Sequence, residues 1–233
     1  MISFKHRHFK KEIVLMLVRW YVAYSLSYRD IEELALERGL SVDHSAINRW
    51  VVRYSPALEA SFRKKYKKPV LSSWHMDETY LKIKGKDVYL YRAIDKSGQT
   101  VDFLLKEKRD KKAALSFFCQ ALGQHGLAEK MTIDKSGSNT AALVRINFTL
   151  YLLFLLTGIL LPISVRQNKY LNNRIEQDHR NIKRITKPML GFKSFPSASA
   201  TIQGIELHQM LRKGQHQDAA NLSIFDQFYQ LAA

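Results

Sequence analysis

Helical spacing of apolar residues dominates the first part of the chain. The stripe from Phe9 to Tyr24 predicts an amphipathic helix. Ser27 and Asp30 are spaced as a capping pair for a short second helix that ends near Gly39. Asp43 is placed to cap a third helix. The inward positions of that third helix are Ile47, Trp50, Val51 and Tyr54.

A period of two replaces the helical period after residue 70. Alternating residues on both sides of a Gly85-Lys86 turn predict a β-hairpin, and a third strand follows Asp95-Lys96-Ser97-Gly98 to give an antiparallel meander. Good helix formers and then a short apolar run come next, which is an α/β pattern. The predicted elements are strands over 74–84, 88–94 and 100–105, a helix over 112–122 and a strand over 130–133.

The next segment is unusually apolar. Twenty residues between Arg145 and Arg166 carry no charge, which is long enough for a membrane-spanning helix. Gly158 and Pro162 interrupt the run. We therefore expect a buried helix followed by a short core strand at Ile163-Ser164-Val165, with membrane or interfacial contact as the alternative.

Composition and charge narrow the classes of partner. The chain has 233 residues, 46% of them hydrophobic, and a formal net charge of +16. Such a charge favours a polyanionic partner, with nucleic acid first and an anionic membrane surface second. Cys119 is the single cysteine, which excludes a disulfide framework and a cysteine-based zinc site. With no secretory signal visible at the N-terminus, we expect a cytoplasmic protein.

The third predicted helix presents a polar outward face. Helix, glycine turn and helix with such a face is typical of a helix-turn-helix DNA reader, whose second helix enters the major groove. A plain helical hairpin with a solvated face is the alternative. The candidate DNA-contacting residues on this face are His44, Ser45, Asn48, Arg49 and Arg53.

Three acids are candidates for a metal site. Asp77 lies within the first predicted strand and Asp134 follows the strand over 130–133. Glu176 lies on a predicted helix from Arg174 to Lys187, with Arg180 and Lys183 on the same face. Carboxylates held on rigid elements of a basic protein favour a divalent cation. For Glu176 alone, an exposed helix with ordinary charge pairs is the alternative.

Several separated motifs resemble the DDE transposases of bacterial insertion sequences, family six. The likeness runs from about Phe4 to Lys213 and includes Val42-Asp43-His44-Ser45 with Trp50. Its other motifs are Trp74-His75-Met76-Asp77-Glu78-Thr79-Tyr80, Tyr89-Leu90-Tyr91-Arg92-Ala93-Ile94-Asp95, Asp134-Lys135, Lys169-Tyr170-Leu171-Asn172-Asn173, Glu176-Gln177-Asp178-His179, Gly191-Phe192-Lys193-Ser194 and Gly204-Ile205-Glu206.

The resemblance implies a fold and a chemistry. The fold class is α/β: an RNase H-like catalytic domain with a mixed sheet, antiparallel hairpins and flanking helices, preceded by an all-α helix-turn-helix domain. We expect the DNA-binding domain and a basic linker at 1–69, the catalytic domain at 70–213 and a tail at 214–233. Asp77, Asp134 and Glu176 are the implied catalytic residues and ligands of two Mg²⁺ ions, with Mn²⁺ as a substitute.

The resemblance also implies partners. These are double-stranded DNA, as terminal inverted repeats and as target, and further copies of the chain in a homodimer or higher synaptic assembly; no membrane is expected. Cleavage and strand transfer would give cointegrates. Lys183 is assigned a DNA-positioning role, with Arg180 and Lys187 as further DNA contacts. Glu78 is taken as a bystander, since adjacent strand residues point to opposite faces.

One spacing departs from the family pattern. Asp134 and Glu176 are 42 positions apart, which is longer than usual by about two helical turns. Either this subgroup has a longer buried helix, such as a dimer contact, or the element has decayed. The alternative function is therefore a catalytically inactive DNA-binding remnant or a repressor of the same element.

Overall fold

A computed structural model describes residues 2–4, 8–167 and 172–233. Lys169, Tyr170 and Leu171 of the motif quoted above lie outside these residues. The chain divides into two compact units. Unit 1 comprises 1–68, 83–85 and 181–233, and unit 2 comprises 69–82 and 86–180. Each is described by itself.

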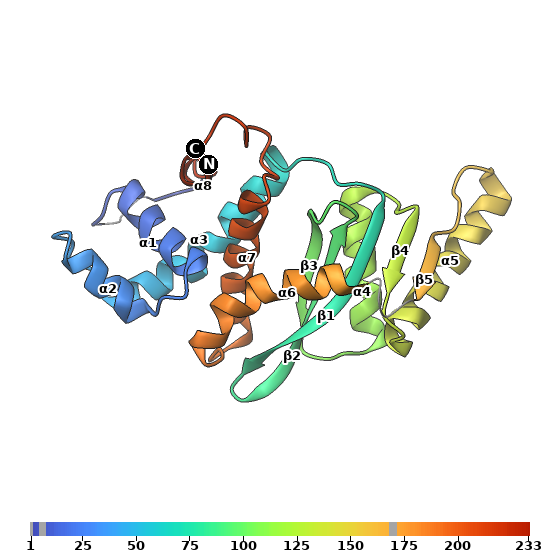
Figure 1. The fold of residues 1–233 in the computed structure, drawn as a ribbon, viewed down its shortest axis with the longest axis horizontal. Helices are drawn as coiled ribbons and strands as arrows, with labels where there is room; N and C mark the ends of the chain where they lie inside the picture. The colour runs from blue at the N-terminus through green and yellow to red at the C-terminus, as the bar shows by residue number, and fades with distance from the viewer. Residues whose placement is uncertain (1, 5–7, 168–171) are drawn as a thin grey trace. The chain divides into compact units, whose positions relative to one another are not determined.

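Unit 2 is built on a five-stranded mixed sheet, which confirms the predicted α/β class (Figure 1). The strand order is β3-β2-β1-β4-β5; β2 and β3 are antiparallel, while β4 runs parallel to both β1 and β5. The elements are β1 (Ser73–Ile83), β2 (Lys86–Asp95), β3 (Thr100–Lys106), α4 (Lys111–His125), β4 (Lys130–Ile133), α5 (Gly137–Thr157), β5 (Ser164–Gln167) and the first part of α6 (Asn173–Thr186).

The turn between β1 and β2 is a two-residue hairpin. Lys84 and Gly85 both have positive φ, at 49° and 78°. Two such residues match the type I′ turn, whose twist suits the strands it joins. The predicted hairpin is confirmed, with its turn one residue earlier than the expected Gly85-Lys86.

The two faces of the sheet have different roles. Trp74 and Met76 of β1 and Tyr91 of β2 belong to one buried apolar cluster with Phe117 and Phe118 of α4. Side chains alternate along a strand. Residues at the intervening positions, Asp77 and Arg92 among them, therefore belong to the opposite face.

The prediction of a buried helix followed by a core strand is wrong for the apolar segment. The helix and the strand both form, and Leu143, Ile146 and Leu150 of α5 are buried. Every residue of β5, however, is exposed. By length and composition α5 is the one helix among the described residues that could cross a membrane, and only 17% of its most apolar stretch is buried. The reason is that the second half of α5 projects away from the sheet (Figure 1).

Unit 1 is helical. It contains α1 (Lys11–Ala23), α2 (Tyr28–Leu36), α3 (His44–Lys65), the 3-10 turn η2 (Lys187–Met189), α7 (Phe195–Arg212) and α8 (Ile224–Gln230). The predicted capping pair of α2 is confirmed, because the Ser27 side chain accepts from the Asp30 N–H and the Asp30 side chain accepts from the Ser27 N–H. Asp43 likewise caps α3 by accepting from the Ser45 N–H.

Helix α3 is longer than its N-terminal pattern suggested. It passes through Pro56 and ends at Lys65, so that the basic residues 63–65 form its last turn. The buried stripe of Val51 and Tyr54 continues at helical spacing with Leu58 and Phe62. Burial of these side chains in unit 1 outweighs the one backbone hydrogen bond that a proline removes.

The residues after Lys213 pack within unit 1. Phe228 of α8 and Leu231 are buried, and Phe225 remains exposed. Ser61 donates to the Leu231 carbonyl at 2.8 Å, and Lys11 donates to the Ala232 carbonyl at 2.9 Å. The tail therefore packs against α1 and α3 of unit 1.

Gly204 is expected to tolerate no side chain. A Cβ at this position of α7 would lie 2.6 Å from the Ser55 Oγ and 2.7 Å from a Val22 methyl. Overpacking of this kind typically costs about 1–3 kcal/mol. Gly204→Ala should therefore lower the free energy of unfolding by that amount in urea titrations. Gly123→Ala, where the added Cβ meets nothing within 4 Å, is the control. Equal stability of the two variants would contradict this packing.

Candidate active site

Parallel pairing of β1 and β4 places two of the predicted acids side by side. His75 is paired with Thr132 in the register of these strands. Continuing that register by two residues sets Asp77 beside Asp134, the first residue after β4. The meeting of these carboxylates therefore follows from the strand order, although 57 positions separate them in the sequence.

Glu78 joins this pair. Carboxylate oxygens of Asp77, Glu78 and Asp134 all lie within 4.8 Å of one another. Alternation along β1 led us to expect Glu78 away from the site, and its sequence position beside Asp77 was the only signal for it. The glutamate side chain is long enough to turn its carboxylate toward the end of β4. Three like charges in so small a volume repel one another, and a positive charge nearby lowers that repulsion.

Arg109 supplies part of the compensating charge. Its Nε and Nη2 lie 3.4 and 3.5 Å from the Glu78 oxygens, and Nη2 lies 3.3 Å from Asp134 Oδ2. Burial raises the pKa of the Glu78 carboxyl above its ordinary value; Asp134 and Asp77 act in the same direction and Arg109 opposes them. Asp134 Oδ1 also accepts from the Ser136 N–H at 3.0 Å and the Asn139 amide at 3.3 Å.

A chain of polar contacts holds Asp77 on the face of the sheet opposite the apolar cluster. His179 Nε2 of α6 lies 3.3 Å from Asp77 Oδ2, and its Nδ1 lies 3.3 Å from Arg92 Nη1. Arg92 Nη2 donates to Asp178 Oδ2 at 2.7 Å. Arg92 is 1% exposed, so this ion pair lies in the interior. In the sequence, Arg92 is a charge within an otherwise apolar strand, and a buried charge requires a partner.

Glu176, the third predicted acid, lies outside the carboxylate cluster. It is exposed on α6, one helical turn before His179. Arg180 and Lys187 are exposed and Lys183 is half-buried. Within the described residues, the structure thus brings Asp77 and Asp134 together, adds Glu78, and leaves Glu176 on the same helix as the Asp77 contact but apart from the cluster.

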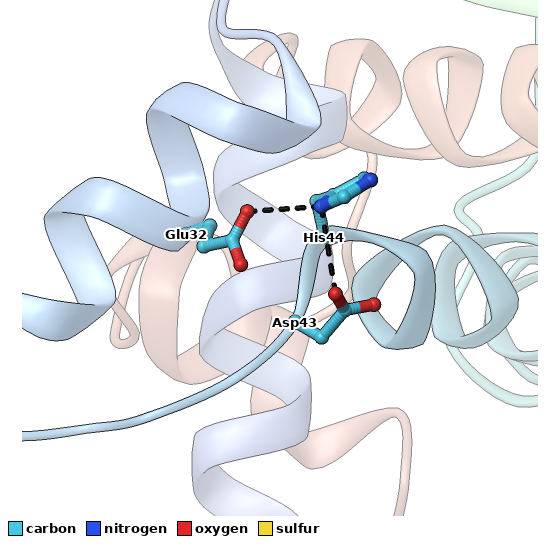
Figure 2. Close-up of side chains that lie close together, drawn as sticks. All are labelled: Glu32, Asp43 and His44. Carbon is cyan, nitrogen blue, oxygen red and sulfur yellow. Dashed lines mark hydrogen bonds and ion pairs between the residues drawn. The ribbon is translucent and has the colours of Figure 1, made fainter.

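The candidate DNA-contacting residues follow the N-terminal part of α3. Figure 2 shows His44 between two acids: its Nδ1 lies 3.0 Å from Glu32 Oε2 and 3.6 Å from Asp43 Oδ2. Arg49 donates to Ser45 Oγ at 3.2 Å. The other two residues of the set are Asn48, which is half-buried, and Arg53, which is exposed.

Comparison with known proteins gives the family. Residues 71–215 match the family described as a DDE domain. The transposase of the insertion sequence-like element IS431mec from Staphylococcus aureus is 40% identical over 211 residues, which cover 90% of this chain and 88% of that relative. The transposase of IS257 in transposon Tn4003 from the same species matches to the same extent. The chain belongs to the DDE transposases of bacterial insertion sequences, family six. This DDE transposase is accordingly a polynucleotidyl transferase.

Two solved structures are also similar to the transposase. The HTLV-2 integrase catalytic core domain in complex with magnesium, in its dimeric form, has 18% identity and a TM-score of 0.43. That match covers 59% of this chain and 86% of the other. The trimeric form has 15% identity and a TM-score of 0.39, covering 70% and 84%.

Proposed function

We propose that this transposase binds the terminal inverted repeats of its own insertion sequence, cleaves the DNA strands and transfers them to target DNA, giving cointegrates. The observation that carries the proposal is the meeting of Asp77 and Asp134 at adjacent ends of parallel strands. Rigid strands hold the two carboxylates in place before DNA arrives, which is what catalysis by positioning requires. We assign the catalytic domain, at 70–213, to the RNase H-like fold.

The acids of the site suit a divalent metal ion. Hard cations such as Mg²⁺ prefer carboxylate oxygens, and three carboxylates converge here with one arginine beside them. Asp77 and Asp134 would hold two Mg²⁺ ions, or Mn²⁺ in their place, together with Glu176. When bound, the ions supply activation of water or a DNA 3′-hydroxyl and neutralise charge on the phosphate.

The protein's own residues orient the first of these ligands. His179 contacts Asp77 at 3.3 Å and is itself set against Arg92. Partners of a ligand fix its rotamer, and their loss typically lowers metal affinity or activity about 10–100-fold. Arg109 contacts the Glu78 and Asp134 carboxylates, where its charge limits their mutual repulsion.

DNA recognition is assigned to the helix-turn-helix domain and its basic linker at 1–69. The contacts would come from His44, Ser45, Asn48, Arg49 and Arg53. Arg180, Lys183 and Lys187 would hold DNA near the acids. We further propose that the transposase acts in the bacterial cytoplasm as a homodimer or higher synaptic assembly, with the segment 214–233 as a tail.

Removal of the Arg53 guanidinium should weaken recognition of the repeats. A side chain that reads a base edge contributes about 1–3 kcal/mol of discrimination, or about 5- to 150-fold in affinity. We expect Arg53→Ala to lose that factor for repeat DNA over scrambled DNA in fluorescence anisotropy titrations. Lys64→Ala, at an exposed cation in the last turn of the same helix, should weaken both DNAs alike. A uniform loss in both variants would contradict base reading by Arg53.

The test of the whole function is a strand-transfer assay with terminal-repeat DNA. Purified transposase with Mg²⁺ is expected to join repeat ends to a target plasmid, and chelation of the metal should stop the reaction. No joining by a protein that binds the repeats would reject the catalytic part of the proposal.

The second candidate is a catalytically inactive DNA-binding remnant or repressor. The exposed position of Glu176 outside the carboxylate cluster favours it. Footprinting would then show protection of the terminal repeats, while Mg²⁺ and Mn²⁺ would give neither nicking nor joining.

A further inference from the structure

The second half of α5 and the loop that follows it form an apolar surface in unit 2. We define the α5 surface by Phe148, Tyr151, Leu155, Leu156, Ile159 and Leu161, which are 50–82% exposed. Together they offer on the order of several hundred Å², since the two aromatic side chains belong to a type that buries roughly 150–250 Å² each. The largest apolar patch of a typical monomer is about 300–600 Å². A stable interface buries about 800 Å² per partner, so the surface is of the right size for one.

Strand β5 lies at an open edge of the sheet next to this surface. β4 is its single partner among the described residues. The Ser164 N–H donates to the Glu129 carbonyl on the β4 side. Because successive residues of a strand point their backbone groups to opposite edges, the N–H and C=O of Val165 point away from β4. No described residue bonds to them, so within the described residues they form an open donor and acceptor pair at the sheet edge.

The edge is closed on one side of Val165. The Asn147 side chain of α5 accepts from the Ile163 N–H and donates to the Ile163 carbonyl, both at 2.8 Å. A groove of about 640 Å³ runs between α5 and β5, and Val144, Phe148, Tyr151 and Val165 contribute to its lining. Hydrogen-bonding groups and apolar side chains are thus available together over a short stretch. An edge of this kind is a template for another strand.

We propose that this surface is the contact between two copies of the transposase, with the two β5 strands antiparallel across a two-fold axis. An isologous interface needs a self-complementary surface, and an edge strand that can pair with its own copy about Val165 satisfies that requirement. At the axis the two Val165 residues exchange both backbone hydrogen bonds, and the α5 surfaces flank them. The proposal deepens the homodimer of the proposed function and rests on that part of it.

Charge selects the register. Pairing Val165 with its own copy sets Arg166 opposite Ser164. Pairing Val165 with Gln167 would set the two Arg166 side chains directly opposite each other, and like charges in that position are destabilising. The α5 surface itself adds no repulsion, since the chain carries no charge from Ile146 to Val165. A two-fold centred on Val165 is therefore the favoured arrangement.

A lipid bilayer fits the α5 surface less well than a second copy of the transposase does. The first half of α5 is part of the unit 2 core through Leu143 and Ile146. The freely exposed part from Tyr151 to Thr157 is about 10 Å long at 1.5 Å per residue, against about 30 Å of hydrocarbon. Open backbone groups at a sheet edge are also excluded from lipid.

Light scattering after size exclusion tests the dimer in the full chain. The wild type should elute at about twice 27.1 kDa, and Tyr151→Glu should elute as a monomer with an unchanged circular dichroism spectrum. Tyr80→Glu is the matched control, since Tyr80 is exposed to a similar extent on β1 of the same unit. A monomeric wild type, or a dimer that Tyr151→Glu leaves intact, would overturn the proposal.

A disulfide tests the register independently. Opposed residues of a hydrogen-bonded antiparallel pair have Cα atoms about 5.5 Å apart, within the range of a disulfide. Val165→Cys in a Cys119→Ser background should form a covalent dimer on mild oxidation, whereas Tyr80→Cys in that background should not. Absence of the cross-link would reject the proposal. It would also be rejected if a monomeric wild type floated with phosphatidylcholine–phosphatidylglycerol vesicles and Tyr151→Glu abolished that flotation. Repeat binding by the wild type in anisotropy titrations separates failure of this interface from failure of the proposed function.

Discussion

Asp77→Ala is expected to lower the rate of strand transfer about 10³-fold or more, because loss of a proposed metal ligand would remove several kcal/mol of transition-state stabilisation. Asp77 lies on a rigid strand with its carboxylate close to those of Asp134 and Glu78. His179 contacts it on the face of the sheet opposite the apolar cluster. Affinity for the terminal repeats should stay unchanged, since Asp77 lies outside the proposed DNA-binding domain. The measurements are product formation with Mg²⁺ and anisotropy titration with the same DNA.

Asp87→Ala is the matched control for this variant. Asp87 is an exposed acid on β2 of the same hairpin, paired with Lys82 at 2.8 Å. Its loss should leave strand transfer within about twofold, since solvent screens the exposed pair and Asp87 is not one of the clustered acids. Equal rates for the Asp77 and Asp87 variants would remove Asp77 from the active site.

The same assay decides which glutamate completes the set of acids. If Glu176 is the third ligand, Glu176→Ala should match the loss caused by Asp77→Ala, and Glu78→Gln should retain most activity. If Glu78 takes that role, the order of the two variants is reversed. Full activity of both variants would leave a site of two acids.

Arg92→Met is expected to destabilise the protein by about 3–5 kcal/mol, the usual cost of removing one partner from a buried ion pair. Arg92 is 1% exposed and its Nη2 lies 2.7 Å from Asp178 Oδ2. Methionine fills much of the space of the side chain but leaves Asp178 and His179 without its guanidinium. The free energy of unfolding from urea titrations measures the effect.

The Lys82 and Asp87 pair provides the comparison for Arg92. Its side chains are 52% and 44% exposed, so Lys82→Met should leave the free energy of unfolding nearly unchanged. The double variant Arg92→Met with Asp178→Leu should recover part of the stability, because no buried charge then remains unpaired. A cost for Arg92→Met as small as that for Lys82→Met would show that the buried pair contributes little.

The sequence predicted the elements around Asp77 well because local rules decide them. Period-two alternation and a turn at Gly85 suffice for the hairpin, and an acid after a short apolar strand suffices to place Asp134 at a strand end. That Asp134 meets Asp77 follows once the strand order is known. Alternation describes Cβ directions alone, so it misplaced the carboxylate of Glu78.

Other features depend on neighbours that periodicity does not specify. The apolar composition of α5 is the same whether its second half is covered or exposed, so burial could not be read from it. Likewise, the grouping of α7 with the N-terminal helices depends on the fit of Gly204 against Ser55 and Val22, residues about 150 to 180 positions away. The buried pair of Arg92 and Asp178 lies across 86 positions.

The parallel pairing of β1 with β4 also determines when Asp77 and Asp134 meet during folding. A chain segment of 57 positions between Asp77 and Asp134 must be closed before the two acids can meet. Non-local pairings of this kind are slow steps of folding. During synthesis the helices of the first 65 residues are made before Asp77 and Asp134. Because α7 completes the packing of unit 1 around Gly204, the N-terminal helices reach their final packing only after the segment that carries Asp134 has been made.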